Sequence, residues 1–166
     1  MLTALRHLVA ILALPVVMAV VVPTWVLTQY AATDTRWQTA MIAWPMRVLG
    51  ALVLLSGLFL FAWCVSLFAR VGRGTLAPWD PTQNLVAVGP YQYVRNPMIT
   101  GVAAILAGQA LITGSRALAL WLLIFVAINF TYFVLVEEPS LARRFGTSYI
   151  EYKTRVPRWI PRHVRR

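Results

Sequence analysis

The chain alternates between long apolar stretches and short polar connections. Apolar residues dominate positions 8–29, 43–69, 97–113 and 117–136. About 20 apolar residues of helix cross the hydrocarbon core of a bilayer, so this pattern predicts four membrane spans, the last two near the lower length limit. The short connection "TGSR" permits only a tight hairpin between those two, and Ala104 and Gly108 form a small-residue pair suited to helix packing. We therefore predict an all-α integral membrane protein with a single domain.

Beyond the last apolar stretch, the pattern becomes that of an amphipathic helix. One helical face of the run 140–156 carries Leu141, Phe145, Tyr149, Tyr152 and Val156. The opposite face carries Arg144, Ser148, Glu151 and Arg155. This division predicts one helix lying in the membrane interface, with its basic side chains at the lipid headgroups.

Composition supports a membrane protein, and the charge distribution predicts its orientation. Of 166 residues, 60% are hydrophobic, the mean hydropathy is +0.70 and the net charge is +10. Lysine and arginine gather before the first stretch, between the second and third, and after the fourth. The positive-inside rule then places both termini, and the polar segments 73–97 and 137–161, on the cytoplasmic side. Because the charges flank apolar stretches, we expect membrane lipids as partners and no nucleic acid.

The chemistry-bearing residue types are few. Cys64 lies inside an apolar stretch, and His7 and His163 lie near opposite termini, so neither a disulfide framework nor a metal site is expected. Arginine outnumbers lysine fourteen to one. We read this excess as the mark of a GC-rich bacterial genome, which would place the protein in the inner membrane.

The motif Arg95-Asn96-Pro97 marks the start of the third apolar stretch. Asparagine is a preferred helix N-cap and proline a preferred first helical residue. A helix start offers free N–H groups and partial positive charge, and arginine adds a planar grip for a carboxylate or phosphate. The plainer alternative is a capped helix with an arginine that touches only lipid headgroups.

Two of the five acids, Glu137 and Glu138, stand together at the end of the fourth stretch. Charges at a membrane boundary are costly unless they are paired or functional. The pair could hold a cationic ligand or could bind Arg95 or Arg158, and the plainer alternative is a solvated pair. Pro157 and Pro161 bracket Arg158 and favour a fixed, non-helical path that would hold it over a pocket.

Three separated motifs occur in order in the second half of the chain. They are Gly89-Pro90-Tyr91 with Arg95-Asn96-Pro97 and Gly101, then Glu137-Glu138, then Phe145-Gly146, Tyr149, Tyr152 and Pro157-Arg158. This order resembles the isoprenylcysteine carboxyl methyltransferase family and the wider group with phospholipid N-methyltransferases, over about residues 75–162. Asn96 replaces a histidine of the eukaryotic-type motif and Ile99 replaces the usual tyrosine. Both departures bear on the acceptor more than on the cofactor.

The resemblance implies S-adenosylmethionine as cofactor and a lipophilic or lipidated acceptor from the bilayer. Residues 1–70 would supply two spans, and residues 71–166 the cofactor-binding half. The implied cofactor-binding residues are Gly89, Tyr91, Arg95, Asn96, Pro97, Glu137, Glu138, Tyr149 and Tyr152, and the implied catalytic residues are Glu138 and Arg158. In this scheme the arginine and the helix start take the cofactor's carboxylate, a glutamate its ammonium or ribose, and tyrosines its sulfonium or adenine.

The acceptor chemistry follows from the bases the site offers. A carboxylate is ionised near neutral pH and needs no base, whereas an ammonium must lose a proton before it attacks. Since no histidine lies near the motifs, we favour carboxyl O-methylation, with a phosphatidylethanolamine-type amine as the second reading. An NADPH-dependent reductase of membrane isoprenoids or sterols and a membrane protein without enzymatic activity are the remaining alternatives. The oligomeric state is open.

Overall fold

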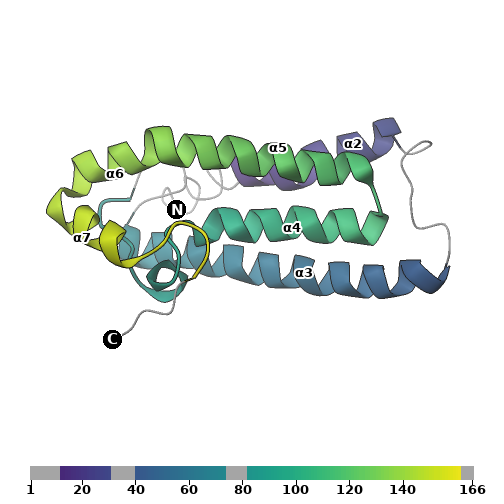
Figure 1. The fold of residues 1–166 in the computed structure, drawn as a ribbon, viewed down its shortest axis with the longest axis horizontal. Coiled ribbons are helices and arrows are strands. Elements are labelled where there is room, and N and C mark those ends of the chain that lie inside the picture. Colours follow the sequence, from purple (N-terminus) through teal and green to yellow (C-terminus); the bar gives the residue numbers. More distant parts are fainter. Residues whose placement is uncertain (1–11, 31–39, 74–81, 162–166) are drawn as a thin grey trace, which may run out of the picture.

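The apolar stretches fold into helices that lie side by side (Figure 1). The computed structural model describes residues 12–30, 40–73 and 82–161. The N-terminal stretch forms a π-helix, η1 (Leu12–Val21), which continues as α2 (Val22–Tyr30). The second stretch forms α3 (Ala40–Leu67), which ends in the π-helical turn η2 (Phe68–Gly72).

The second half of the chain begins with a short turn and continues as an antiparallel helical hairpin. Its elements are the 3-10 turn η3 (Gly89–Gln92), α4 (Pro97–Thr113), α5 (Arg116–Tyr132), the π-helical turn η4 (Phe133–Glu137), α6 (Glu138–Phe145) and α7 (Thr147–Arg155). The predicted tight connection between α4 and α5 is confirmed. Gly114, with φ +70°, ends α4, and the Ser115 hydroxyl accepts a hydrogen bond from the Leu118 N–H (3.1 Å) at the start of α5.

In the described part of the chain, two continuous helices are long and apolar enough to cross a membrane. They run over Met41–Gly72 and Arg116–Phe145, with 32 and 30 residues, and the apolar helices Pro15–Tyr30 and Pro97–Thr113 are shorter. Large apolar side chains cover the outside of the long helices, for example Met41 (90% exposed) and Phe59 (69%). No strand occurs in the residues that the structure describes. The fold is therefore all-α with an apolar exterior, which is the pattern of a protein embedded in lipid.

Glycines bring α3 and α4 into close contact along their length. A Cβ at Gly57 would lie 2.7 Å from the Gly101 carbonyl oxygen, and a Cβ at Gly108 would lie 2.7 Å from the Gly50 carbonyl oxygen. Ala104 lies at the same contact, 3.0 Å from the Cβ position of Gly57, so the predicted packing role of Ala104 and Gly108 is confirmed. Small residues at this spacing let two backbones approach closely, which fixes the N-terminal end of α4 against the C-terminal half of α3.

Pro23 removes a backbone donor from the N-terminal helix, and side chains of two other helices take its place. Pro23 has no N–H, so it cannot donate to the Ala19 carbonyl four residues before it, as an α-helix requires, or to the Met18 carbonyl five residues before it, as a π-helix requires. Gln109 Nε2 of α4 donates to the Ala19 carbonyl (2.8 Å), and Trp121 Nε1 of α5 donates to the Met18 carbonyl (3.1 Å). Because unpaired carbonyls are costly in an apolar layer, these bonds attach η1 to α4 and α5.

The single amphipathic helix predicted for residues 140–156 is wrong in one respect. Gly146 adopts φ +55° and ψ −131°, a conformation that residues with a Cβ rarely reach, and it breaks the run into α6 and α7. α6 continues the line of α5, whereas α7 turns back toward α4 (Figure 1). The apolar and polar faces are as predicted, but the glycine between the two helices changes the direction of the chain.

A double-mutant cycle tests the proline replacement. We expect Pro23→Ala to return an N–H to the Ala19 carbonyl, so Gln109→Leu should cost less in that background than in the wild type. The coupling energy should be about 0.6 kcal/mol and at most about 1.7 kcal/mol, measured as unfolding free energy in detergent. Asn129→Leu is the control, because Asn129 donates to the Phe125 carbonyl of its own helix (2.8 Å) and should combine additively with Pro23→Ala. Additive effects of Pro23→Ala and Gln109→Leu on the unfolding free energy would refute the idea that Gln109 replaces the missing N–H of Pro23.

Candidate functional site

Segments from the whole second half of the chain meet at the N-terminal end of α4. The Arg95 N–H donates to the Pro157 carbonyl (2.9 Å), and the Tyr152 hydroxyl donates to the Tyr91 carbonyl (2.7 Å). These bonds bring α7 and the C-terminal segment 156–161 onto the turn that precedes α4 (Figure 1). Residues separated by about 60 positions are thereby placed in one site.

The turn η3 is built to pack against α3. Gly89 has φ +60°, and a Cβ there would lie 3.0 Å from Leu67, so both its conformation and its surroundings favour glycine. The Tyr91 ring is buried, stacks on Phe68 (5.7 Å between centroids) and packs beside Cys64. The structure thus places Gly89 and Tyr91, both sequence-predicted cofactor residues, where they shape the turn, and contact of either with a cofactor stays a prediction.

The Glu138 carboxylate is the centre of the site. Its side chain is 4% exposed and accepts from Arg95 NH1 (2.8 Å), from Arg158 Nε (2.6 Å) and NH2 (3.3 Å), and lies 3.0 Å from Lys153 Nζ. We call these four residues the Glu138 cluster. The hydrogen bond to Glu138 raises the pKa of Arg158, so this arginine stays charged. The sequence allows the glutamates either to hold a ligand or to pair with arginine, and Glu138 pairs with two arginines and with Lys153, the one lysine in the sequence.

The Glu138 cluster carries more positive than negative charge. Three cations share one carboxylate, which leaves a surplus of two positive charges in the cluster. Within the described residues, four buried donors on the same segments have no acceptor in good geometry: Arg95 Nε, Asn96 Nδ2, the Tyr149 hydroxyl and Trp159 Nε1. Two of them, on Arg95 and Tyr149, lie close to each other, and the arginine acts to lower the pKa of the phenol. Buried polar groups are almost always hydrogen-bonded, so this group of donors indicates a place for an anionic or oxygen-rich ligand.

Asn96 occupies the predicted position but not the predicted interaction. Pro97 is the first residue of α4, as expected, and the backbone carbonyl of Asn96 accepts from the Thr100 N–H (3.3 Å). The Asn96 side chain makes no capping hydrogen bond, although the residue is only 6% exposed. The expectation of a side-chain N-cap is therefore wrong, because Asn96 at φ −129° and ψ 56° does not turn its side chain back onto the helix. Its amide is left free for a ligand.

Glu137 differs from its neighbour in having no partner. It ends η4, it is partly buried, and within the described part of the chain it makes no hydrogen bond or ion pair. The nearest opposite charge that acts on it is Arg144. Of the two adjacent glutamates, Glu138 is saturated by protein cations, and Glu137 is the one available to a cation from outside the chain.

Tyr149 and Tyr152 form the wall of the site on α7. Their rings lie 6.2 Å apart, and Tyr149 is only 1% exposed. Burial raises the pKa of both phenols, although the Arg95 guanidinium nearby opposes the shift. Neither phenol ionises near neutral pH, so these tyrosines supply ring faces and a hydroxyl donor but no general base.

A cavity of about 390 Å³ opens beside this wall, between the segment before α4 and α7. Its lining residues are Leu85, Ala87, Gln92, Ser148, Glu151, Tyr152, Arg155 and Val156. Cavities of this size hold small-molecule ligands, and Tyr152 is common to the cavity and to the wall of the site.

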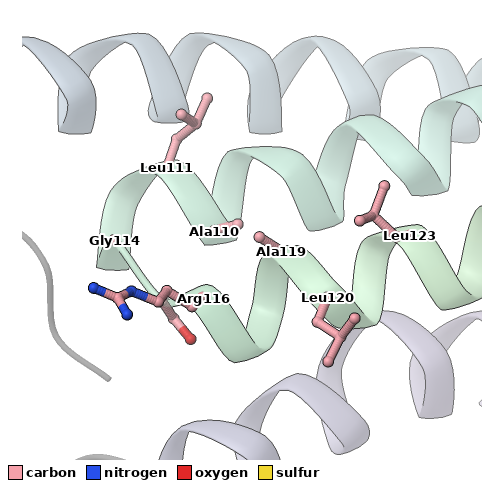
Figure 2. A pocket seen from close by; sticks show the side chains of 8 residues that line it. Ala110, Leu111, Gly114, Arg116, Ala119, Leu120 and Leu123 are labelled. Atoms are coloured by element: carbon pink, nitrogen blue, oxygen red, sulfur yellow. The ribbon is translucent and has the colours of Figure 1, made fainter. Parts of the chain in front are cut away.

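A larger cavity, of about 470 Å³, lies at the opposite end of α4 (Figure 2). Its lining residues are Ala110, Leu111, Gly114, Ser115, Arg116, Ala119, Leu120 and Leu123. These side chains are mostly aliphatic and include no carboxylate, histidine or thiol. The larger cavity therefore offers lipid-like surroundings but no acid–base chemistry.

Two residues of the site were missed by sequence reasoning, Lys153 and Trp159. Lys153 lies four residues after Tyr149 and three residues before Val156, so it shares their face of α7. This spacing is the signal in the sequence that could have placed Lys153 at the site. Trp159 lies between Pro157 and Pro161, and nothing in the sequence says which way a short non-helical segment turns its side chains.

Removal of the central carboxylate should destabilise the protein. Glu138→Gln leaves the buried Arg95 (side chain 8% exposed) without a counter-charge. Breaking a buried ion pair from one side costs about 3 kcal/mol, which should lower the Tm by roughly 6–12 °C. The control is Glu151→Gln, which breaks an exposed pair with Arg155 (3.5 Å) and should change the Tm little. Equal, small changes in both variants would show that the Glu138 cluster does not hold the site together.

Comparison with known proteins places the chain in a family. A family model described as phospholipid methyltransferase matches residues 45–148, more than half of the chain. The match includes α4, its preceding turn and both adjacent glutamates, and ends one residue before Tyr149. Comparisons with curated proteins and with solved structures give no match. The family match confirms the resemblance to the wider methyltransferase group, and the chain belongs to the phospholipid methyltransferase family.

Proposed function

We propose that this protein is an S-adenosylmethionine-dependent membrane methyltransferase that acts on a lipophilic acceptor. The observation that carries the proposal is the Glu138 cluster with its surplus positive charge. Beside it, among the described residues, lie four buried donors without acceptors and Glu137, a carboxylate without an ion pair. The family match adds that the chain belongs to a methyltransferase family. All of these features lie at one end of apolar helices, where water and lipid are both close.

The residues present fit the charges of S-adenosylmethionine. Arg95 Nε and the Asn96 amide offer hydrogen bonds to the cofactor's carboxylate, and Glu137 offers a partner for its ammonium. The faces of Tyr149 and Tyr152 suit the sulfonium or the adenine ring. When bound, the cofactor would supply a methyl group that is already activated for transfer.

The protein's own contribution would be positioning and exclusion of water. In methyl transfer, alignment of donor and acceptor can account for much of the rate. Glu138 would act as a positioning residue, because it fixes the side chains of Arg95 and Arg158 through direct hydrogen bonds. Arg158 is 38% exposed at its side chain, so it could also touch the acceptor's polar group.

We favour a carboxylate as the acceptor. The site is rich in donors and positive charge, which suits an oxygen anion, and a carboxylate needs no base. One observation supports the second reading, a phospholipid amine: Glu137 has no ion-pair partner in the described part of the chain and could accept the proton of an ammonium. The family's description, phospholipid methyltransferase, likewise names a phospholipid.

We propose four membrane spans with both termini, and the site, on the cytoplasmic side. The proposal rests on the distribution of lysine and arginine, and on the exposed Arg70, Arg143 and Arg144 near the site's end of the molecule. A cytosolic cofactor could then reach the site directly, and a lipophilic acceptor could reach it from the bilayer.

Cofactor binding separates this proposal from its rivals. We expect the detergent-purified protein to bind S-adenosylhomocysteine in calorimetry and not to bind NADPH. Glu137→Gln should weaken that binding by about 1.5–3 kcal/mol, the usual value of a hydrogen bond to a charged group. Ser56→Ala, at an exposed position in the middle of α3, should not. Binding of NADPH alone would favour a reductase, and binding of neither would favour a protein without this activity.

The chemistry of the product identifies the acceptor. The protein is supplied with methyl-labelled S-adenosylmethionine and a native lipid extract, and the labelled lipid is treated with mild alkali. We expect the label to be released as volatile methanol, as a carboxyl methyl ester requires. Alkali-stable label that follows phosphatidylethanolamine derivatives would replace the carboxylate with the phospholipid amine.

A further inference from the structure

The C-terminal segment 156–161 is attached to the site at two adjacent residues, Pro157 and Arg158. The Pro157 carbonyl accepts from the Arg95 N–H (2.9 Å), and Arg158 binds Glu138 through two nitrogens. Two such attachments on adjacent residues leave the next side chain, Trp159, little freedom of direction. Its placement is therefore a property of the fold and not of a loose tail.

Trp159 lies across the boundary between the outer apolar face and the buried site. Its ring stacks on Phe130 (6.3 Å between centroids, 28° between planes) and meets Phe133 edge-on (6.0 Å, 61°). Phe130 is 46% exposed on the outside of α5, whereas Phe133 is 1% exposed and begins the π-helical turn that ends at Glu137. The indole thus connects the surface that faces lipid with the helix turn that carries the unpaired glutamate.

The indole N–H has no acceptor among the residues that the structure describes. Trp159 Nε1 is buried and makes no hydrogen bond there, while its ring contacts Phe130 and Phe133. A tryptophan that only anchors a protein in the interface keeps its N–H in contact with headgroups or water. A buried N–H at an apolar boundary instead calls for an oxygen acceptor on a molecule that is otherwise lipophilic.

We propose that Trp159 determines specificity for the methyl acceptor. Its N–H donates to an oxygen of the acceptor's polar group, and its ring, with Phe130, seats the beginning of the acceptor's apolar chain. This inference rests on the proposed function and adds the element that selects the acceptor. The polar donors on Arg95 and Asn96 remain with the cofactor, since they lie at the start of α4 and not on the outer face of α5.

Trp159→Phe tests the inference, because it keeps the stacked ring and removes the N–H. With stearate or phosphatidylethanolamine in mixed micelles as acceptor, we expect the KM for the acceptor to rise about three- to tenfold, the effect of one lost hydrogen bond. S-adenosylhomocysteine affinity should not change, which also shows that the variant is folded. Trp44→Phe is the matched control, since Trp44 is 71% exposed near the start of α3, away from the site.

A second measurement does not depend on the cofactor. Stearate brominated in mid-chain should quench the tryptophan fluorescence of the wild type and of Trp44→Phe saturably, and the Trp159→Phe variant should lose the saturable part. An unchanged KM with unchanged quenching would overturn the inference. Weaker S-adenosylhomocysteine binding with an unchanged KM would also overturn it, because the N–H would then serve the cofactor. A wild type that binds no S-adenosylhomocysteine would refute the proposed function, and the quenching would still decide the role of Trp159.

Discussion

One carboxylate with three cations holds the functional end of this protein together. Glu138 begins α6 within the long helix Arg116–Phe145, and its partners come from the start of α4, from α7 and from the C-terminal segment. A charge that is 4% exposed must be compensated locally, because its desolvation is otherwise too costly. This requirement fixes the relative positions of elements that are distant in the sequence. The same arrangement leaves the cluster with surplus positive charge. The cations therefore both hold the segments together and favour an anionic ligand.

The apolar helices provide the frame on which this end is built, and they obey a different constraint. In an apolar layer there is little hydrophobic drive for helices to associate, so close packing and hydrogen bonds must hold them. Gly57 and Gly101 supply the close packing between α3 and α4. Gln109 and Trp121 supply hydrogen bonds to the Ala19 and Met18 carbonyls, which lie one helical turn before Pro23 and its missing N–H. The start of α4 is therefore held on a frame that does not depend on the charged cluster.

The position of the site at the end of apolar helices suits a reaction between unlike partners. Charged and donor groups lie on the segments around the start of α4, and aromatic rings lead from there to the outer face of α5. A polar cofactor and a lipophilic acceptor could each approach from the phase in which it dissolves. The adjacent glutamates differ for the same geometric reason: among the described residues Glu138 pairs with three cations, whereas Glu137 makes no ion pair.

The sequence by itself determined the all-α class of the protein and its family group. Apolar runs longer than a soluble core needs can only form helices in lipid, and Pro97 and Gly114 mark helix ends through local backbone chemistry. The motifs Arg95-Asn96-Pro97 and Glu137-Glu138 identified the family group that the comparison confirms. Only the tertiary structure decided which glutamate is paired, that the Asn96 amide does not cap its helix, and that Gly146 turns α7 back toward α4. It also brought Lys153 and Trp159 into the site. The physical reason is that local patterns report a residue's own backbone and burial, whereas charge pairing and side-chain direction in a non-helical segment depend on groups far away in the chain.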